Sequence, residues 1–232
     1  MRLFYDNTID TSATEHILSE EESKHIVKVL RLKKGDKIGI LNGFGSVFTT
    51  EISDPHPKRC ALSIVDIKTE ERPNYDIHIA VGPTKQMERL EWFIEKATEI
   101  GITEITLLTS KNSERVRLKL DRLERKAISA MKQSLRSFLP VINELTTIED
   151  FVQKHPNGLI AHCLNDDKAA ISEVYKSSNC PILIGPEGDF SEEERGEILA
   201  FKGVQPIKIN ENILRSETAV ISALSIVNYL IN

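Results

Sequence analysis

Cysteine is scarce in this chain, and the spacing of a metal site is missing. The three cysteines, Cys60, Cys163 and Cys180, lie far apart, and no Cys-x-x-Cys or His-x-x-x-His pair joins them to the six histidines. An odd number of isolated cysteines is typical of buried reduced thiols and not of a disulfide framework. The pattern argues against a structural zinc site. We expect no bound metal, and a protein of the cytoplasm.

Long apolar runs are also missing. No segment approaches the roughly 18 apolar residues of a membrane-spanning helix, and residues 1–10 hold no continuous apolar run that would serve as a signal peptide. What is present is ordinary for a globular protein: 232 residues, 40% of them hydrophobic and 28% charged. That length and composition predict two folded domains.

Basic residues are fewer than acidic ones in the whole chain, but they are concentrated in two segments. The formal net charge is −5, yet residues 24–37 hold six basic residues against one acidic, and residues 111–136 hold nine against three. Clustered Lys and Arg suit a polyanionic partner, because they neutralise phosphates and release counterions. Two solvated helix faces explain the same charges equally well.

The first seventy residues have the pattern of a small β-barrel. Short stretches rich in β-branched or aromatic residues lie at 2–5, 37–41, 46–52 and 61–65, separated by turn residues. One helix interrupts them, because Ser19 and Glu22 form a capping box before an apolar pattern. The polar stretch 68–74 is then a linker.

From Tyr75 onward, strands and helices alternate, which is typical of a mostly parallel α/β sheet. The expected strands are residues 77–81, 105–108, 158–162, 181–184 and 207–209, and the expected helices are residues 85–100, 120–137 and 216–231. Gly101 ends the first of these helices, as a left-handed glycine commonly does.

The strongest local signal is a turn after the apolar strand at residues 181–184. The chain turns through Gly185, Pro186 and Gly188, and Ser191 with Glu194 forms a capping box that starts a helix. Ligands of open α/β sheets bind beyond the carboxyl ends of strands, where this loop lies. The loop indicates a binding site, with a plain strand-to-helix turn as the alternative.

A second loop leads into the helix at residues 216–231, which is apolar nearly all round. Such a helix is buried on more than one side, within the domain or against a partner subunit. Ser216 as a cap and Glu217 near the positive end of the helix dipole have a structural explanation. Arg215 does not, because the same dipole disfavours a cation.

Motifs spread over nearly the whole chain resemble the bacterial 16S ribosomal RNA methyltransferases that methylate N3 of a uridine, members of the knotted SPOUT class. The motifs are Arg2-Leu3-Phe4, residues 25–31 followed by Gly35, residues 85–91 and 96–101, Ser113-Glu114-Arg115, residues 133–136, and the loops at 185–188 and 213–219. Each motif is weak alone, but their order along one chain is hard to obtain by chance.

The resemblance implies an α/β fold class: an N-terminal PUA-like β-barrel, residues 1–72, followed by a SPOUT methyltransferase domain, residues 73–232, with a C-terminal trefoil knot. It implies a homodimer through the knotted helices, S-adenosyl-L-methionine as the cofactor, and 16S ribosomal RNA or the small ribosomal subunit as the partner. The cofactor contacts that it implies are Leu183, Gly185, Pro186, Glu187, Gly188, Ile209, Asn210, Ile213 and Leu214. The expected RNA-binding residues are Arg2, His25, Lys28, Arg31, Lys85, Arg115 and Arg136.

The reaction that the resemblance implies sets the expected catalytic residues. N3 of uracil carries a proton and is a poor nucleophile until that proton leaves, so the site needs a base or a group that stabilises the anion. Arg215 is expected to stabilise the developing anion or to orient the base. Glu217 is the expected proton acceptor, and Glu187 is a second candidate for that role.

The sequence departs from the family pattern in both loops. Asp189 stands where the family usually has a second glycine after Gly188, and Asn210 and Asn212 stand where a Gly and an Arg are usual. Asp189 adds a carboxylate beside the cofactor loop.

Other functions stay open at this point. A Rossmann-type methyltransferase is disfavoured, because Gly43-Phe44-Gly45 lacks the third glycine of the fingerprint. A SPOUT methyltransferase acting on another RNA is one alternative. The other is a non-catalytic RNA-binding factor of ribosome assembly.

Overall fold

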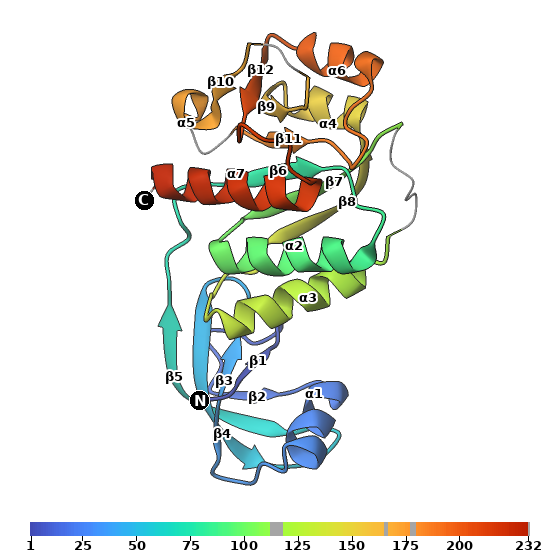
Figure 1. The fold of residues 1–232 in the computed structure, drawn as a ribbon. Helices are drawn as coiled ribbons and strands as arrows, with labels where there is room; N and C mark the ends of the chain where they lie inside the picture. Colours follow the sequence, from blue (N-terminus) through green and yellow to red (C-terminus); the bar gives the residue numbers. More distant parts are fainter. Residues whose placement is uncertain (112–117, 165–166, 177–179, 232) are drawn as a thin grey trace. The chain divides into compact units, whose positions relative to one another are not determined.

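The computed structural model describes residues 1–111, 118–164, 167–176 and 180–231. The chain divides into two compact units (Figure 1). The first comprises Met1–Arg72 and Met131–Leu139, and the second Pro73–Ala130 and Pro140–Asn232. Residues 131–139 therefore pack with the N-terminal part, which sequence reasoning did not anticipate. The expected domain boundary between residues 72 and 73 stays a prediction.

The first unit is built on a five-stranded sheet with the order β1-β3-β4-β5-β2. The strands are β1 (Leu3–Tyr5), β2 (Glu15–Ile17), β3 (Lys37–Leu41), β4 (Ser46–Asp54) and β5 (Ala61–Thr69). Its apolar core includes Ile26, Ile38, Ile40, Phe48 and Leu62, all fully buried. Strand β5 runs through Thr69, so the expected linker begins two residues later than predicted. Strand β2 was missed because it is only three residues long and mostly exposed.

The expected helix of the first unit is present but changes its winding. The Ser19 hydroxyl accepts the amide N–H of Glu22 and caps helix α1 (Glu20–Lys24). From His25 to Val29 the chain forms a π-helical turn, in which the amide of Leu30 donates to the His25 carbonyl at 3.0 Å. Arg31 then adopts a left-handed backbone with φ of +55°. Single π-turns are frequent at functional sites.

The second unit holds a seven-stranded parallel sheet with the order β10-β12-β9-β11-β6-β7-β8. The strands are β6 (His78–Val81), β7 (Glu104–Thr109), β8 (Val141–Thr147), β9 (Asn157–Ala161), β10 (Ala169–Ala170), β11 (Ile182–Ile184) and β12 (Gly203–Lys208). Strand β11 lies between β9 and β6, so residues far apart in sequence become neighbours. The expected parallel α/β architecture is confirmed.

Six helices accompany this sheet, and Figure 1 shows α7 lying beside α2. They are α2 (Met87–Ile100), α3 (Leu120–Gln133), α4 (Ile148–Lys154), α5 (Ile171–Val174), α6 (Glu192–Leu199) and α7 (Ser216–Ile231), among the described residues. Gly101 ends α2 with φ of +114°, as predicted. Helix α3 ends four residues earlier than expected, because the chain leaves helical geometry and Leu135 has φ of +59°.

No helix in the described part of the chain is both long and apolar enough to span a membrane. The three cysteines are free, but only Cys60 is buried, and Cys163 is exposed. The expectation that all three thiols are buried was therefore wrong. Cys163 lies in the loop after β9, where it borders the site described next.

Candidate cofactor and RNA site

A cavity of about 540 Å³ opens at the carboxyl ends of three neighbouring strands, β9, β11 and β12. Its walls are the chain after each strand and the first turn of α7. The residues that line it are Ala161 to Leu164, Asp167, Lys168, Ile184, Gly185, Pro186, Asp189, Ile207 to Leu214, Ser216 and Ala219. Ligands of parallel α/β sheets bind at this edge, and the volume falls in the range of about 300–1,000 Å³ of small-molecule sites.

The loop after β11 is held tightly against its neighbours. The Ser216 hydroxyl donates to the Gly185 carbonyl at 2.9 Å, which ties the start of α7 to the end of β11. On the other side, a Cβ at Gly82 would lie 2.7 Å from the backbone nitrogen of Pro186. Only glycine allows this approach. Because its hydroxyl binds the Gly185 carbonyl, Ser216 positions this loop. The interpretation of Ser216 as a simple helix cap did not foresee that role.

Asp189 takes the position where the family pattern has glycine, and the backbone explains that preference. Its φ is +59°, a conformation that glycine adopts without cost. The aspartate carboxylate adds two hydrogen bonds that glycine cannot make. Oδ1 accepts the amide N–H of Phe190 and Oδ2 accepts that of Cys163, both at 2.8 Å. The second bond joins the loop after β11 to the loop after β9.

Charges of both signs line the cavity. Lys208 pairs with Glu211 at 2.8 Å, and the Lys168 ammonium donates to the carbonyl of His162 at 2.7 Å. Burial raises the pKa of the Cys163 thiol, and the neighbouring Asp189 carboxylate raises it further. The site can therefore bind a ligand that carries a positive charge, a negative charge and an apolar portion.

A second polar cluster joins α2, the loop after β11 and α7. Nη1 of Arg89 lies 3.4 Å from Oε1 of Glu187, and Nε of Arg89 lies 3.8 Å from Oε1 of Glu217. Glu217 is 8% exposed, and its Oε2 has no hydrogen-bond partner among the described residues. Arg89 thus links two candidate catalytic carboxylates. Sequence reasoning missed Arg89, although it lies within a motif that carried the resemblance.

Six of the nine residues predicted to contact the cofactor line the cavity: Gly185, Pro186, Ile209, Asn210, Ile213 and Leu214. Leu183 instead packs in the apolar core of the sheet, while Glu187 and Gly188 lie outside the lining. The wall after β9 was missed. The signal that could have found it is the order of the strands, because β9 lies between β11 and β12.

Two of the predicted RNA-binding residues border a hollow of about 380 Å³ in the first unit. Arg2 and His25 line it together with Lys132 and the carboxylates of Glu21 and Glu22. Burial raises the pKa of Glu22, against the opposing charge of Lys132. Among the other candidates, Lys28, Arg31 and Lys85 are exposed and Arg136 is partly exposed. Arg115 lies outside the described residues.

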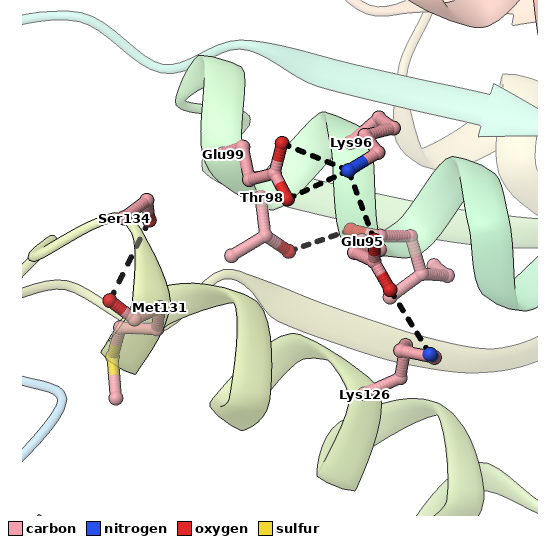
Figure 2. A network of polar contacts seen from close by, with 8 residues as sticks. Glu95, Lys96, Thr98, Glu99, Lys126, Met131 and Ser134 are labelled. Carbon is pink, nitrogen blue, oxygen red and sulfur yellow. Dashed lines mark hydrogen bonds and ion pairs between the residues drawn. The ribbon is translucent and has the colours of Figure 1, made fainter.

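The basic helix α3 meets carboxylates of its own chain. Lys126 binds Glu95 of α2 at 2.9 Å, and Figure 2 shows Glu95 also bound to Lys96, which reaches Glu99. Arg122 pairs with Glu91 of α2. These cations are partly neutralised before any ligand arrives, which supports the alternative of a charged helix face for this part of the segment.

Comparison with known families decides the class of protein. Residues 70–228 match the RNA methyltransferase domain family, and residues 18–65 match the PUA domain of RNA methyltransferases. The chain belongs to this family of RNA methyltransferases. The fold expected from the motifs, a PUA domain followed by an α/β methyltransferase domain, is thereby confirmed.

Members of the family resemble the chain over nearly its whole length. The ribosomal RNA small subunit methyltransferase E of Rickettsia conorii is 28% identical, covering 99% of this chain and 95% of that protein. The structure of a probable rRNA-methyltransferase from Porphyromonas gingivalis is 38% identical with a TM-score of 0.88, covering 99% and 98% of the two chains. A methyltransferase structure from Legionella pneumophila in complex with its cofactor SAM is 26% identical with a TM-score of 0.84, covering 98% and 96%.

Proposed function

We propose that this protein transfers a methyl group from S-adenosylmethionine to N3 of a uridine in 16S ribosomal RNA. The observation that carries the proposal is the cavity at the ends of β9, β11 and β12, which is lined by the loops of the family motifs. The small-subunit methyltransferase from Rickettsia conorii and the cofactor-bound structure from Legionella pneumophila support the substrate and the cofactor. Neither of the alternatives, a different RNA or a non-catalytic factor, has an observation in its favour.

The donor groups of the cavity fit S-adenosylmethionine. This cofactor carries an apolar-faced adenine, a sulfonium, an ammonium and a carboxylate. Ile184, Ile207 and Leu214 offer an apolar wall, and Asp189 and Lys168 offer opposite charges for the polar end. When bound, the cofactor supplies an activated methyl group, so the protein must mainly align donor and acceptor.

Arg215 is the residue proposed to stabilise the negative charge that develops on the target uracil. It is exposed at the start of α7, and its side chain forms no hydrogen bond or ion pair within the described part of the chain. An unpaired cation at the positive end of a helix dipole is disfavoured until a negative partner arrives. A uracil that has lost its N3 proton is such a partner, with its charge shared by the flanking carbonyl oxygens.

Glu217 is the proposed proton acceptor, with Glu187 as the second candidate. Both carboxylates face Arg89, which lies 3.4 Å from Glu187 and 3.8 Å from Glu217. An ionised carboxylate near the target base can accept a hydrogen bond from N3–H and then the proton itself.

The binding of RNA and the assembly state complete the proposal. The residues proposed to hold the phosphate backbone are Arg2, His25, Lys28 and Arg31 of the first unit, together with Lys85 and Arg136.

The exposed apolar side chains of α7, Tyr229 and Leu230, are proposed to contact a second copy of the chain in a homodimer. The proposed compartment is the cytoplasm, where ribosomal RNA is modified. The trefoil threading of the C-terminal segment belongs to this proposal as well.

Single-turnover methylation of 16S ribosomal RNA tests the proposed chemistry. With the cofactor saturating, Arg215→Ala and Glu217→Gln are each expected to slow methyl transfer on the order of a hundredfold. Lys202→Ala, an exposed cation before β12, is the matched control. A wild-type rate for Arg215→Ala would give this residue a structural role only.

Mapping of the modified nucleotide separates the proposed substrate from its alternatives. The 16S ribosomal RNA of a deletion strain is expected to lack one methylated uridine. Calorimetric titration with S-adenosylmethionine separates an enzyme from a non-catalytic factor, which would give no binding heat.

A further inference from the structure

The hollow of about 380 Å³ in the first unit has the lining of a binding site, although the methyl-transfer chemistry does not use it. Its wall combines the basic side chains of Arg2, His25 and Lys132 with the carboxylates of Glu21 and Glu22. All of these residues belong to the first unit, because the segment that holds Lys132 packs there. The volume lies at the lower end of the range of about 300–1,000 Å³ for small-molecule sites. The hollow therefore suits one small, flat ligand group.

An irregular stretch of backbone shapes one wall of this hollow. The π-helical turn closes with a hydrogen bond from the Leu30 amide to the His25 carbonyl, and both residues line the hollow. Arg31 follows with φ of +55°, which a non-glycine residue adopts at a cost. The exposed His25 ring meets the buried Phe4 ring edge-on, with the centroids 6.2 Å apart. Strained backbone and π-turns cluster at functional sites, so the wall has the character of a ligand contact.

Glu22 places a half-buried acceptor in the hollow without a donor to match it. Its backbone amide takes part in the cap of α1, but its carboxylate has no hydrogen bond or ion pair among the residues that the structure describes. Burial raises the pKa of this carboxyl, although the charges of Lys132 and His25 oppose the shift. A ligand that donates hydrogen bonds to the carboxylate would stabilise its ionised form.

A phosphate group alone does not account for this carboxylate. Phosphate offers only acceptors and negative charge, so Glu21 and Glu22 would weaken its binding. The edges of an unpaired RNA base carry both donors and acceptors, and proteins recognise single-stranded RNA through them. A hollow that holds carboxylates and cations together therefore fits a base better than it fits the backbone.

Guanine is the base whose edges match the lining. It alone has two N–H donors side by side, N1–H and N2–H, which face the two oxygens of one carboxylate. Its O6 and N7 are acceptors that Arg and Lys commonly contact. Arg2 and Lys132 supply such donors in the same hollow, and neither side chain has a hydrogen bond or ion pair within the described part of the chain.

We propose that this hollow binds an unpaired guanine of the RNA substrate. The Glu22 carboxylate accepts hydrogen bonds from N1–H and N2–H, Arg2 and Lys132 face O6 and N7, and the base stacks on the His25 ring. The inference rests on the proposed function, in which Arg2 and His25 contact the RNA. It adds the recognition of a base to those contacts with the backbone, and base contacts are what give specificity for sequence.

Binding of short labelled RNAs to the full-length protein, followed by fluorescence anisotropy, tests this inference. One RNA contains only uridine, and four others carry a single central guanosine, inosine, adenosine or cytidine. The guanosine RNA is expected to bind about tenfold more tightly than the uridine RNA, the effect of one bidentate base contact. Inosine lacks the N2 amine and is expected to lose most of that preference. Glu22→Gln should bring the ratio of the two Kd values close to one, while Glu20→Gln, on the same helix but outside the hollow, should keep the wild-type ratio.

The inosine RNA tests the contact without any change to the protein, so the result does not depend on the folding of a variant. Equal affinities of the wild type for the guanosine, inosine and uridine RNAs would overturn the inference. A preference for adenosine or cytidine, or a guanosine preference that Glu22→Gln retains, would overturn it as well, and so would a wild type that binds none of these RNAs. Methylation of 16S ribosomal RNA by the same preparation is measured separately. If methylation proceeds in any of these cases, the proposed function stands without the guanine site.

Discussion

Nε of Arg89 lies 3.8 Å from Oε1 of Glu217, and the other oxygen of that buried carboxylate, Oε2, has no hydrogen-bond partner among the described residues. Arg89 and Glu217 lie in the first turns of two helices, α2 and α7, that pack against each other. A carboxylate with 10% of its side chain exposed depends on its counter-charge, because removing one partner of a buried ion pair leaves the other uncompensated. The stability of this helix pair and the placement of a candidate catalytic carboxylate therefore depend on the same contact.

Arg89→Ala is expected to lower the free energy of unfolding by about 2 kcal/mol, since it leaves the Glu217 charge without its partner. The value lies below that of a fully buried pair because 29% of the Arg89 side chain is exposed. Adding Glu217→Gln removes the charge and should recover part of the loss. Urea denaturation of the wild type, both single variants and the double variant gives the coupling energy. Additive effects of the two substitutions would contradict this coupling.

Glu194 is expected to be a structural carboxylate that holds the loop after β7 to α6. It is 5% exposed, Oε1 accepts the amide of Lys111 at 2.6 Å, and Oε2 accepts that of Ser191 at 2.8 Å. Glu194→Gln turns one acceptor into a donor that faces an N–H, so the free energy of unfolding should fall by about 2 kcal/mol.

The neighbouring residue offers a control for Glu194. Glu193 pairs with the Lys111 ammonium at the surface, where 68% of its side chain is exposed. Exposed ion pairs contribute little, so Glu193→Gln is expected to leave the free energy of unfolding close to that of the wild type. Equal midpoints of thermal unfolding for the two variants would contradict the assigned role of Glu194.

Stability is expected to fall in mild acid because of His78. Burial lowers the pKa of His78 to about 4, against the opposing effect of Glu104. Burial also lowers the pKa of His155, whose ring meets that of His78 edge-on. The unfolded chain, with an ordinary histidine pKa of about 6.5, takes up the proton first. Stability is therefore complete above about pH 6.5 and is lost as the pH falls toward 4, by on the order of 3 kcal/mol.

Denaturation midpoints measured between pH 4 and 8 check this expectation. His78→Gln should reduce the slope of the profile between pH 4 and 6.5, because the more strongly shifted of the two histidines is gone. His56→Gln, in the first unit, is the control and should keep the wild-type slope. A slope that His78→Gln does not reduce would assign the acid sensitivity to other groups.

The contribution of Arg31 to RNA binding can be measured through salt. Arg31→Asn removes the charge but suits the left-handed backbone at this position, since Asn tolerates positive φ. The slope of log K against log salt concentration should shrink by about one for the RNA substrate. Wild-type slope and affinity would remove Arg31 from the RNA contacts. Glu20→Gln, on the neighbouring helix, controls for changes of the fold.

Local patterns predicted the elements that local chemistry determines. Helix α7 begins and ends where expected, because its apolar pattern is continuous from Ser216 to Ile231. The loop at Gly185 and the capping box at Ser191 were also predicted, since glycine, proline and capping residues act over a few positions. Helix α3 was predicted too long, because no residue near Leu135 is a typical helix breaker.

The remainder of the site depends on contacts between distant residues. The bond from the Cys163 amide to Asp189 spans 26 positions, and that from Arg89 to Glu187 spans 98. No periodicity reports such pairs, because they follow from the strand order. The trefoil threading is non-local in the same way and stays a prediction of the resemblance.

The hydrogen bond from Ser216 to Gly185 also has a consequence for the order of synthesis and folding. The cavity needs β9, β11, β12 and the first turn of α7, so it cannot close on a nascent chain before residue 216 has left the ribosome. The first five strands need no such delay, because their pairing is complete by Thr69. During translation the PUA unit can therefore compact first, apart from its contribution from residues 131–139, while the methyltransferase unit waits for its last helix. A newly made molecule would gain its cofactor cavity only after the first turn of α7 has emerged from the ribosome.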